Sequence, residues 1–139
     1  EFEHYTGESF YEDKLAGAVA RLEEAGILSE SEGAEVVDLG EKTPPFLVRK
    51  SDGATLYGTR DLAAALYRLE EFDPARVLYV VGAPQRLHFE QLFAVLGMIE
   101  PEATKKFVHV AYEHTRFPDR AMKTRKGDVV YLQDVLEAA

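Results

Sequence analysis

Residues 77–92 read VLYVVGAPQRLHFEQL, and this stretch decides the expected fold. Five apolar residues run without a break over Val77–Val81, and three of them are β-branched, which is typical of a strand buried on both faces of a parallel sheet. Gly82 and Pro84 end the strand, and Pro84 suits the first turn of a helix. Apolar residues at helical spacing follow over residues 89–99, so the stretch predicts one half of a βαβ unit.

Two polar residues, Gln85 and His88, come directly after this strand and lie off the apolar stripe of the helix. In open α/β sheets, ligands bind beyond the carboxyl ends of the parallel strands. Gln85 and His88 are therefore candidate ligand-binding residues. The simpler interpretation, that both are solvated residues at a helix start, stays open.

The rest of the chain alternates between helix and strand patterns. We expect a helix over 12–25, strands over 34–39 and 46–50, and a hairpin turn over 51–53 with a return strand over 54–57. A helix is expected over 60–71, with Thr59 as its N-cap and Asp61 in its first turn. Strands over 107–112 and 128–131 and a helix from Leu132 complete the pattern. Residues 29–33 read as an acidic turn. The pattern predicts an α/β fold, with a mostly parallel sheet and an antiparallel hairpin appendage.

Composition limits the classes of function. The chain has 139 residues, a net charge of −9 and no cysteine, so it is one domain or part of one, without disulfides or cysteine metal sites, as suits a reducing compartment. The acidic balance argues against a general nucleic-acid-binding surface. No apolar run reaches the roughly 18–20 residues that span a bilayer, so no membrane partner is expected. Because the first residue is Glu1 and not Met, we expect the chain to derive from a longer one.

Residues 122–127 read MKTRKG and place three cations within four residues. They belong to a basic segment, residues 116–126, which has five basic side chains and one acidic side chain, whereas residues 1–50 have 12 acidic and 5 basic side chains. Such a loop can neutralise the charge on a departing pyrophosphate, and mobility would let it close over a nucleotide. A solvated basic loop is the alternative.

No metal site is expected from the sequence. The four histidines lack the spacing with carboxylates that metal ligands need, and His109 reads as a strand residue. No phosphate loop of the Walker type is present, and no carboxylate pair typical of glycosidases.

Three segments together resemble the catalytic domain of arginyl-tRNA synthetases, in its bacterial form: YGTRDLA at 57–63, VGAPQRLHF at 81–89 and MKTRKG at 122–127. Residues 7–11 and 45–53 also resemble it, so the likeness runs from about Gly7 to Ala139. It implies a class I ligase with a partial Rossmann-like nucleotide-binding fold. Such an enzyme activates arginine with ATP and Mg²⁺, transfers it to tRNA(Arg), and is expected to be monomeric and cytoplasmic.

The resemblance also implies roles for individual residues. It implies that Tyr57, Asp61 and Gln85 bind arginine. It implies that His88, Met122, Thr124 and Lys126 bind ATP, and that Lys123, Arg125 and Lys126 take part in catalysis. A carboxylate such as Asp61 suits a guanidinium, because it accepts a charge-assisted and often bidentate pair of hydrogen bonds.

Three departures from the family pattern matter. The usual K-M-S-K-S loop reads AMKTR at 121–125 with neither lysine in register, so the loop cations are expected phosphate contacts and not direct equivalents. Pro84 stands where other members often have a charged or polar residue. No H-I-G-H motif is present, so we expect residues 1–139 to be the second half of a catalytic domain, inactive alone, with the first half before Glu1 and the anticodon-binding domain after Ala139.

Two other functions stay open on the sequence alone. One is a non-catalytic binding module derived from a synthetase, with which the acidic first half is compatible. The other is a related ligase that joins an amino acid to something other than tRNA. An H-I-G-H motif encoded upstream in the parent reading frame would favour the enzyme over the binding module.

Overall fold

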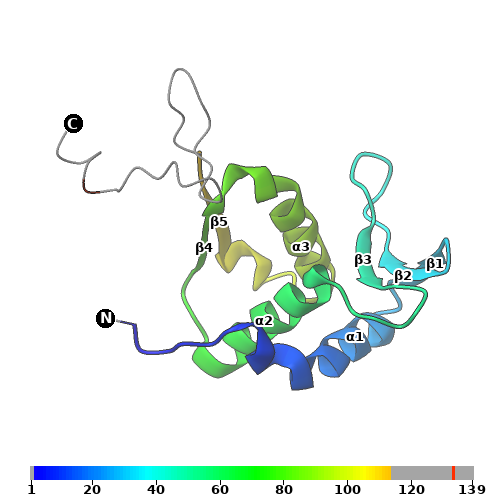
Figure 1. The fold of residues 1–139 in the computed structure, drawn as a ribbon, viewed down its shortest axis with the longest axis horizontal. Helices are drawn as coiled ribbons and strands as arrows, with labels where there is room; N and C mark the ends of the chain where they lie inside the picture. Colours follow the sequence, from blue (N-terminus) through cyan, green and yellow to red (C-terminus); the bar gives the residue numbers. More distant parts are fainter. Residues whose placement is uncertain (1, 114–132, 134–139) are drawn as a thin grey trace.

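The computed structural model describes residues 2–113 and 133, in which helices and strands alternate along the chain (Figure 1). The α/β class is confirmed. The strand expected at 128–131 and, apart from Gln133, the helix expected from Leu132 lie outside the described residues. The elements are η1 (Glu8–Lys14), α1 (Leu15–Glu24), β1 (Leu28–Ser31), β2 (Ala34–Val37), β3 (Phe46–Arg49), α2 (Tyr57–Phe72), β4 (Val77–Gly82), η2 (Ala83–Gln85), α3 (Arg86–Ile99), η3 (Thr104–Lys106) and β5 (Phe107–Tyr112).

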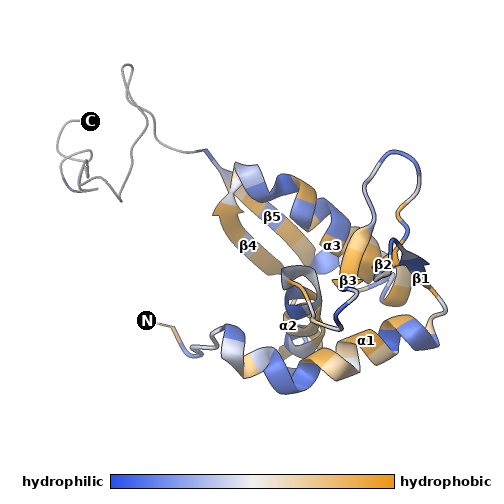
Figure 2. Ribbon diagram, turned by 45° about the vertical axis from the view of Figure 1, so that its right-hand side comes forward, coloured by the Kyte–Doolittle hydropathy of each residue, from blue (hydrophilic) through white to orange (hydrophobic). Residues whose placement is uncertain are grey.

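Strands β4 and β5 pair in parallel, in register from Val77 opposite Phe107 to Gly82 opposite Tyr112, and α3 connects them as predicted. Pro84 lies in η2, at the helix start, which is also as predicted. The prediction that β4 is buried on both faces is wrong for the described structure, since Leu78 is 56% exposed. The alternate residues face α3, where Tyr79 packs on Phe89. Only one face of the two-stranded sheet is covered by described helices, although β4 is hydrophobic along most of its length (Figure 2).

The antiparallel part is a separate three-stranded sheet in the order β1-β2-β3, in which β1, and not the expected return strand at 54–57, is the third strand. The acidic turn expected at 29–33 shrinks to the connection at Glu32 and Gly33, which both have positive φ, and β1 extends to Ser31. The predicted return strand at 54–57 is reduced to a single bridge between Arg49 and Thr55.

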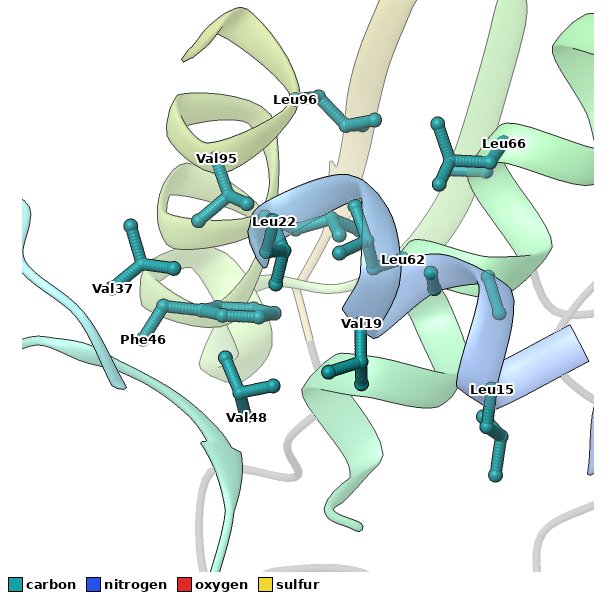
Figure 3. Close-up of a cluster of buried hydrophobic side chains, with 14 of the residues drawn as sticks. Leu15, Val19, Leu22, Val37, Phe46, Val48, Leu62, Leu66, Val95 and Leu96 are labelled. Atoms are coloured by element: carbon teal, nitrogen blue, oxygen red, sulfur yellow. The ribbon is translucent and has the colours of Figure 1, made fainter. Parts of the chain in front are cut away.

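The hydrophobic core lies where α1, α2, α3 and the inner face of the antiparallel sheet meet (Figure 3). The labelled side chains of this core are Leu15, Val19, Leu22, Val37, Phe46, Val48, Leu62, Leu66, Val95 and Leu96. At the surface, Arg21 of α1 forms ion pairs with Glu70 of α2 and with Glu100 at the end of α3. The three helices are therefore held together by apolar burial, with partly exposed charge pairs at the edge.

The start of α2 differs from the prediction in a way that matters for the site. Thr59 is not the N-cap, because the helix already begins at Tyr57. Thr59 is fully buried, and its hydroxyl donates a 2.5 Å hydrogen bond to the carbonyl oxygen of Val48 in β3. The sequence predicts Asp61 in the first turn of this helix. Because α2 begins at Tyr57, Asp61 instead lies just after the first turn. A buried hydroxyl needs a partner, and the tertiary contact provides one in place of a local cap.

Among the described residues, no helix is both long and apolar enough to cross a membrane.

Gly58 gives a direct test of how tightly α2 docks on β3. An added Cβ at Gly58 would lie 2.7 and 2.8 Å from ring atoms of Phe46, whose side chain is buried. We therefore expect Gly58→Ala to lower the free energy of unfolding by about 1–3 kcal/mol, as overpacking does. Gly17, inside α1, is the matched control because an added Cβ there meets nothing within 4 Å.

Gly17→Ala should raise the free energy of unfolding by about 0.5–1 kcal/mol, because alanine has the higher helix propensity. Urea unfolding followed by circular dichroism gives both values. If Gly58→Ala is as stable as Gly17→Ala, the close contact between α2 and Phe46 does not exist.

Candidate functional site

A cavity of about 600 Å³ lies at the carboxyl end of β4, beside the first turns of α2 and α3. Its volume is in the range of about 300–1,000 Å³ that is typical of small-molecule sites. The lining residues are Glu8, Tyr57, Arg60, Asp61, Arg68, Tyr79, Val81, Gln85, His88 and Phe89. The four predicted site residues that the structure describes, Tyr57, Asp61, Gln85 and His88, are thus brought together from two separate sequence motifs.

Asp61 and His88 make the shortest polar contact between two residues that both line the cavity. The Nε2 atom of His88 lies 2.6 Å from Oδ2 of Asp61, and the two side chains are 26% and 42% exposed. An ionised carboxylate only accepts hydrogen bonds, so the Nε2–H group of His88 is the donor. Among the described residues, no hydrogen bond is formed to the other oxygen, Oδ1, and this oxygen can accept a bond from a ligand.

Tyr57 and Gln85 lie at the outer edge of the cavity. Tyr57 is the first residue of α2 and is 72% exposed, and Gln85 is an exposed residue that ends η2. Both side chains are therefore free to move toward a ligand that enters from solvent. The parallel strand directs Gln85 and His88 to one edge of the sheet, as the sequence predicted.

In the inner wall of the cavity, the cation Arg68 lies near two tyrosine rings, of which Tyr79 also lines the cavity and Tyr11 does not. Arg68 donates a 3.0 Å hydrogen bond from Nη1 to the hydroxyl of Tyr79, and its guanidinium carbon lies 5.4 Å from the Tyr79 ring centroid and 5.9 Å from that of Tyr11. Burial raises the pKa of the Tyr79 phenol, although Arg68 opposes the shift, so the hydroxyl stays protonated at neutral pH. Arg68 is thereby occupied by the protein itself.

Arg60 joins the cavity rim to η1. Its Nη2 atom lies 2.5 Å from Oε1 of Glu12 and its Nη1 atom 3.5 Å from Oε2 of Glu8, whereas its buried Nε atom has no hydrogen-bond partner among the described residues. Glu8 is mostly exposed and adds a second carboxylate to the cavity lining. These ion pairs therefore connect η1 to the start of α2 at the rim of the cavity.

His109 supports the cavity from behind and is the strand residue that the sequence predicted. It lies in β5, and its Nε2–H group donates a 2.9 Å hydrogen bond to the carbonyl oxygen of Val81. Its ring is tilted by 34° against that of Phe89, with centroids 4.5 Å apart. His109 thus fixes two residues that line the cavity.

Six lining residues were not predicted as site candidates: the apolar Val81 and Phe89, and the polar Glu8, Arg60, Arg68 and Tyr79. Glu8 and Arg60 could have been predicted, because both lie in segments that carry the family resemblance. Arg68 and Tyr79 had no such signal, since their contact depends on how α2 packs against β4. The predicted loop residues Met122, Lys123, Thr124, Arg125 and Lys126 lie outside the described residues. Residues 2–113 and 133 contain no group of three or more potential metal ligands.

Comparisons with known proteins agree with this architecture. A family model described as "tRNA synthetases class I (R), catalytic domain" matches residues 2–139. The arginine–tRNA ligase of Leuconostoc mesenteroides is 50% identical over 141 residues, which cover 99% of this chain and 25% of the ligase. The arginine–tRNA ligase of Clostridioides difficile is 48% identical over 140 residues, covering 100% of this chain and 25% of the ligase. The chain thus spans about a quarter of the length of these curated relatives.

Solved structures show the same likeness. The arginyl-tRNA synthetase of Plasmodium falciparum superposes with a TM-score of 0.73 at 30% identity, over 79% of this chain and 20% of that protein. The Thermus thermophilus arginyl-tRNA synthetase gives a TM-score of 0.70 at 21% identity, over 91% of this chain and 27% of that protein, and supports the fold alone. These likenesses confirm the Rossmann-like fold class. Since the family model covers almost the entire sequence, the chain belongs to the family of class I tRNA synthetase (R) catalytic domains.

Proposed function

We propose that the cavity binds the side chain of arginine in an arginine–tRNA ligase, which activates arginine with ATP and transfers it to tRNA(Arg). The observation that carries the proposal is the carboxylate of Asp61, which lies in the cavity beside Tyr57, Gln85 and His88 and has one oxygen without a bond from the described residues. A guanidinium presents several N–H donors in a planar fork, and a carboxylate with a free oxygen accepts them. The two cations of the lining, Arg60 and Arg68, already have protein partners.

The arrangement of charge favours a cationic amino acid over a triphosphate in this cavity. Its acceptors are Asp61 and Glu8, and its cations are engaged by Glu12 and Tyr79. We therefore assign the ATP phosphates to the basic loop, in which Met122, Thr124 and Lys126 would contact ATP, and Lys123, Arg125 and Lys126 would stabilise the leaving pyrophosphate. Mg²⁺ would accompany ATP without a site of its own in the protein. The monomeric state and the cytoplasmic location stay predictions from the family.

Asp61→Asn separates the functional role of this carboxylate from a structural one. Asparagine keeps the shape and one oxygen but loses the charge. In an arginine–tRNA ligase that carries this segment, we expect the KM for arginine to rise by about tenfold or more, each tenfold being about 1.4 kcal/mol, because one partner of a charge pair is removed. Stability should fall by at most about 1 kcal/mol, since the Asp61–His88 pair is partly exposed.

Arginine-dependent ATP–pyrophosphate exchange with tRNA(Arg) present and thermal unfolding, measured on the same protein, give the two effects. Asp13→Asn is the control, because this exposed carboxylate lies outside the cavity. A mutant that melts much earlier but retains a normal KM for arginine would make Asp61 a structural residue and remove the proposed pocket.

The 139-residue chain alone should not catalyse this exchange. It contains no H-I-G-H sequence, and we expect that motif to supply part of the adenylate site. Orientation and charge stabilisation each contribute several kcal/mol to such a reaction, so half of a site gives no measurable turnover. The assay is the same exchange reaction on the purified chain with tRNA(Arg) added. Turnover above the no-arginine blank would show that these residues suffice.

A further inference from the structure

We propose that His88 is a positioning residue of the arginine site, which holds Asp61 in the orientation that receives the guanidinium. The inference rests on the proposed function. It assigns to His88 a contribution to arginine affinity, which differs from the ATP contact that the family resemblance implies.

The geometry of the pair is the first argument. The Nε2–H group of His88 engages only Oδ2 of Asp61, at 2.6 Å. A carboxylate has two oxygens that together accept about four hydrogen bonds, so one oxygen can be held by the protein while the other serves the ligand. Without a donor on Oδ2, a side chain that is 42% exposed could rotate about its χ angles toward solvent.

The second argument is that His88 is itself fixed. It lies in the first turn of α3, its side chain is only 26% exposed, and its ring makes an edge contact with Phe89 at 5.2 Å between centroids. Phe89 is buried, and it packs on both Tyr79 and His109. The donor therefore stands on a rigid support that joins α3 to the parallel strands, and it can transmit that rigidity to Asp61 on α2.

The third argument is the number of donors. An imidazole presents a single N–H group to the carboxylate from Nε2, whereas an ammonium or a guanidinium at position 88 would bring several donors. Histidine thus orients Asp61 through Oδ2 and leaves Oδ1 available to the guanidinium.

The test measures dissociation constants for L-arginine and for ATP on the 139-residue chain by calorimetry or NMR titration. We expect His88→Leu to weaken arginine binding by roughly tenfold and to leave ATP binding unchanged, because the hydrogen bond to a charged group is lost. His88→Gln retains a donor near the position of Nε2 and should stay within about threefold of the original affinity. Glu90→Gln, an exposed position on the same helix, is the control.

A double-mutant cycle with Asp61→Asn decides whether His88 acts through Asp61. If it does, the double mutant binds arginine no more weakly than Asp61→Asn alone. Additive losses would mean that His88 contacts the ligand itself. Normal arginine affinity in His88→Leu, an effect on ATP alone, or failure of His88→Gln to rescue would each overturn the inference.

The two proposals fail in different ways. If the original chain and Asp61→Asn bind arginine equally, or neither binds it, the proposed arginine site falls and this inference with it. If Asp61→Asn loses affinity and His88→Leu does not, only the inference falls. Circular dichroism checks the folding of each variant, and His88→Ala replaces His88→Leu if the latter does not fold.

Discussion

The anchoring of the first turn of α2 on β3 is the constraint on which the rest of the structure depends. Thr59 donates to the carbonyl oxygen of Val48, and Gly58 lets the helix approach the ring of Phe46 closely. Because both contacts are buried, they leave little freedom in the position or the rotation of the helix end. Tyr57 and Asp61 lie on either side of this anchored turn, and both line the cavity.

The other half of the cavity depends on the parallel strands. The pairing of β4 with β5 fixes where β4 ends, and the bond from His109 to Val81 together with the ring of Phe89 supports that end. Helix α3 starts there and carries His88. The contact between His88 and Asp61 is therefore the place where two independently supported elements meet. The carboxylate of Asp61 is thus already ordered before a ligand binds, so that binding would cost little conformational entropy.

Much of the architecture could be predicted from sequence periodicity. The errors of that prediction have physical causes. The uninterrupted apolar run of 77–81 correctly predicted a parallel strand, but sequence cannot show which helices cover each face, so the exposure of Leu78 was missed. The sequence of β1, Leu-Ser-Glu-Ser, has no apolar alternation and read as part of a turn. Thr59 has the residue type of an N-cap, but a tertiary acceptor in β3 took its hydroxyl.

The location of the candidate site was predicted better than the contacts within it. The order of the motifs was enough to expect Tyr57, Asp61, Gln85 and His88 near one another, and all four line one cavity, whereas their ligand-binding roles stay predictions. The Asp61–His88 bond depends on the packing of α2 beside α3, and the contact of Arg68 with Tyr79 depends on the packing of α2 against β4. Neither packing geometry is encoded in a local pattern.

The central claim is that a charge pair between Asp61 and a guanidinium selects the ligand. Comparing the affinities of this chain for L-arginine and L-citrulline tests it most directly, because citrulline has nearly the same length and shape but an uncharged ureido group. We expect arginine to bind at least about tenfold more tightly than citrulline, and Asp61→Asn to remove most of this preference. Equal affinity for the two amino acids in the original chain would contradict it.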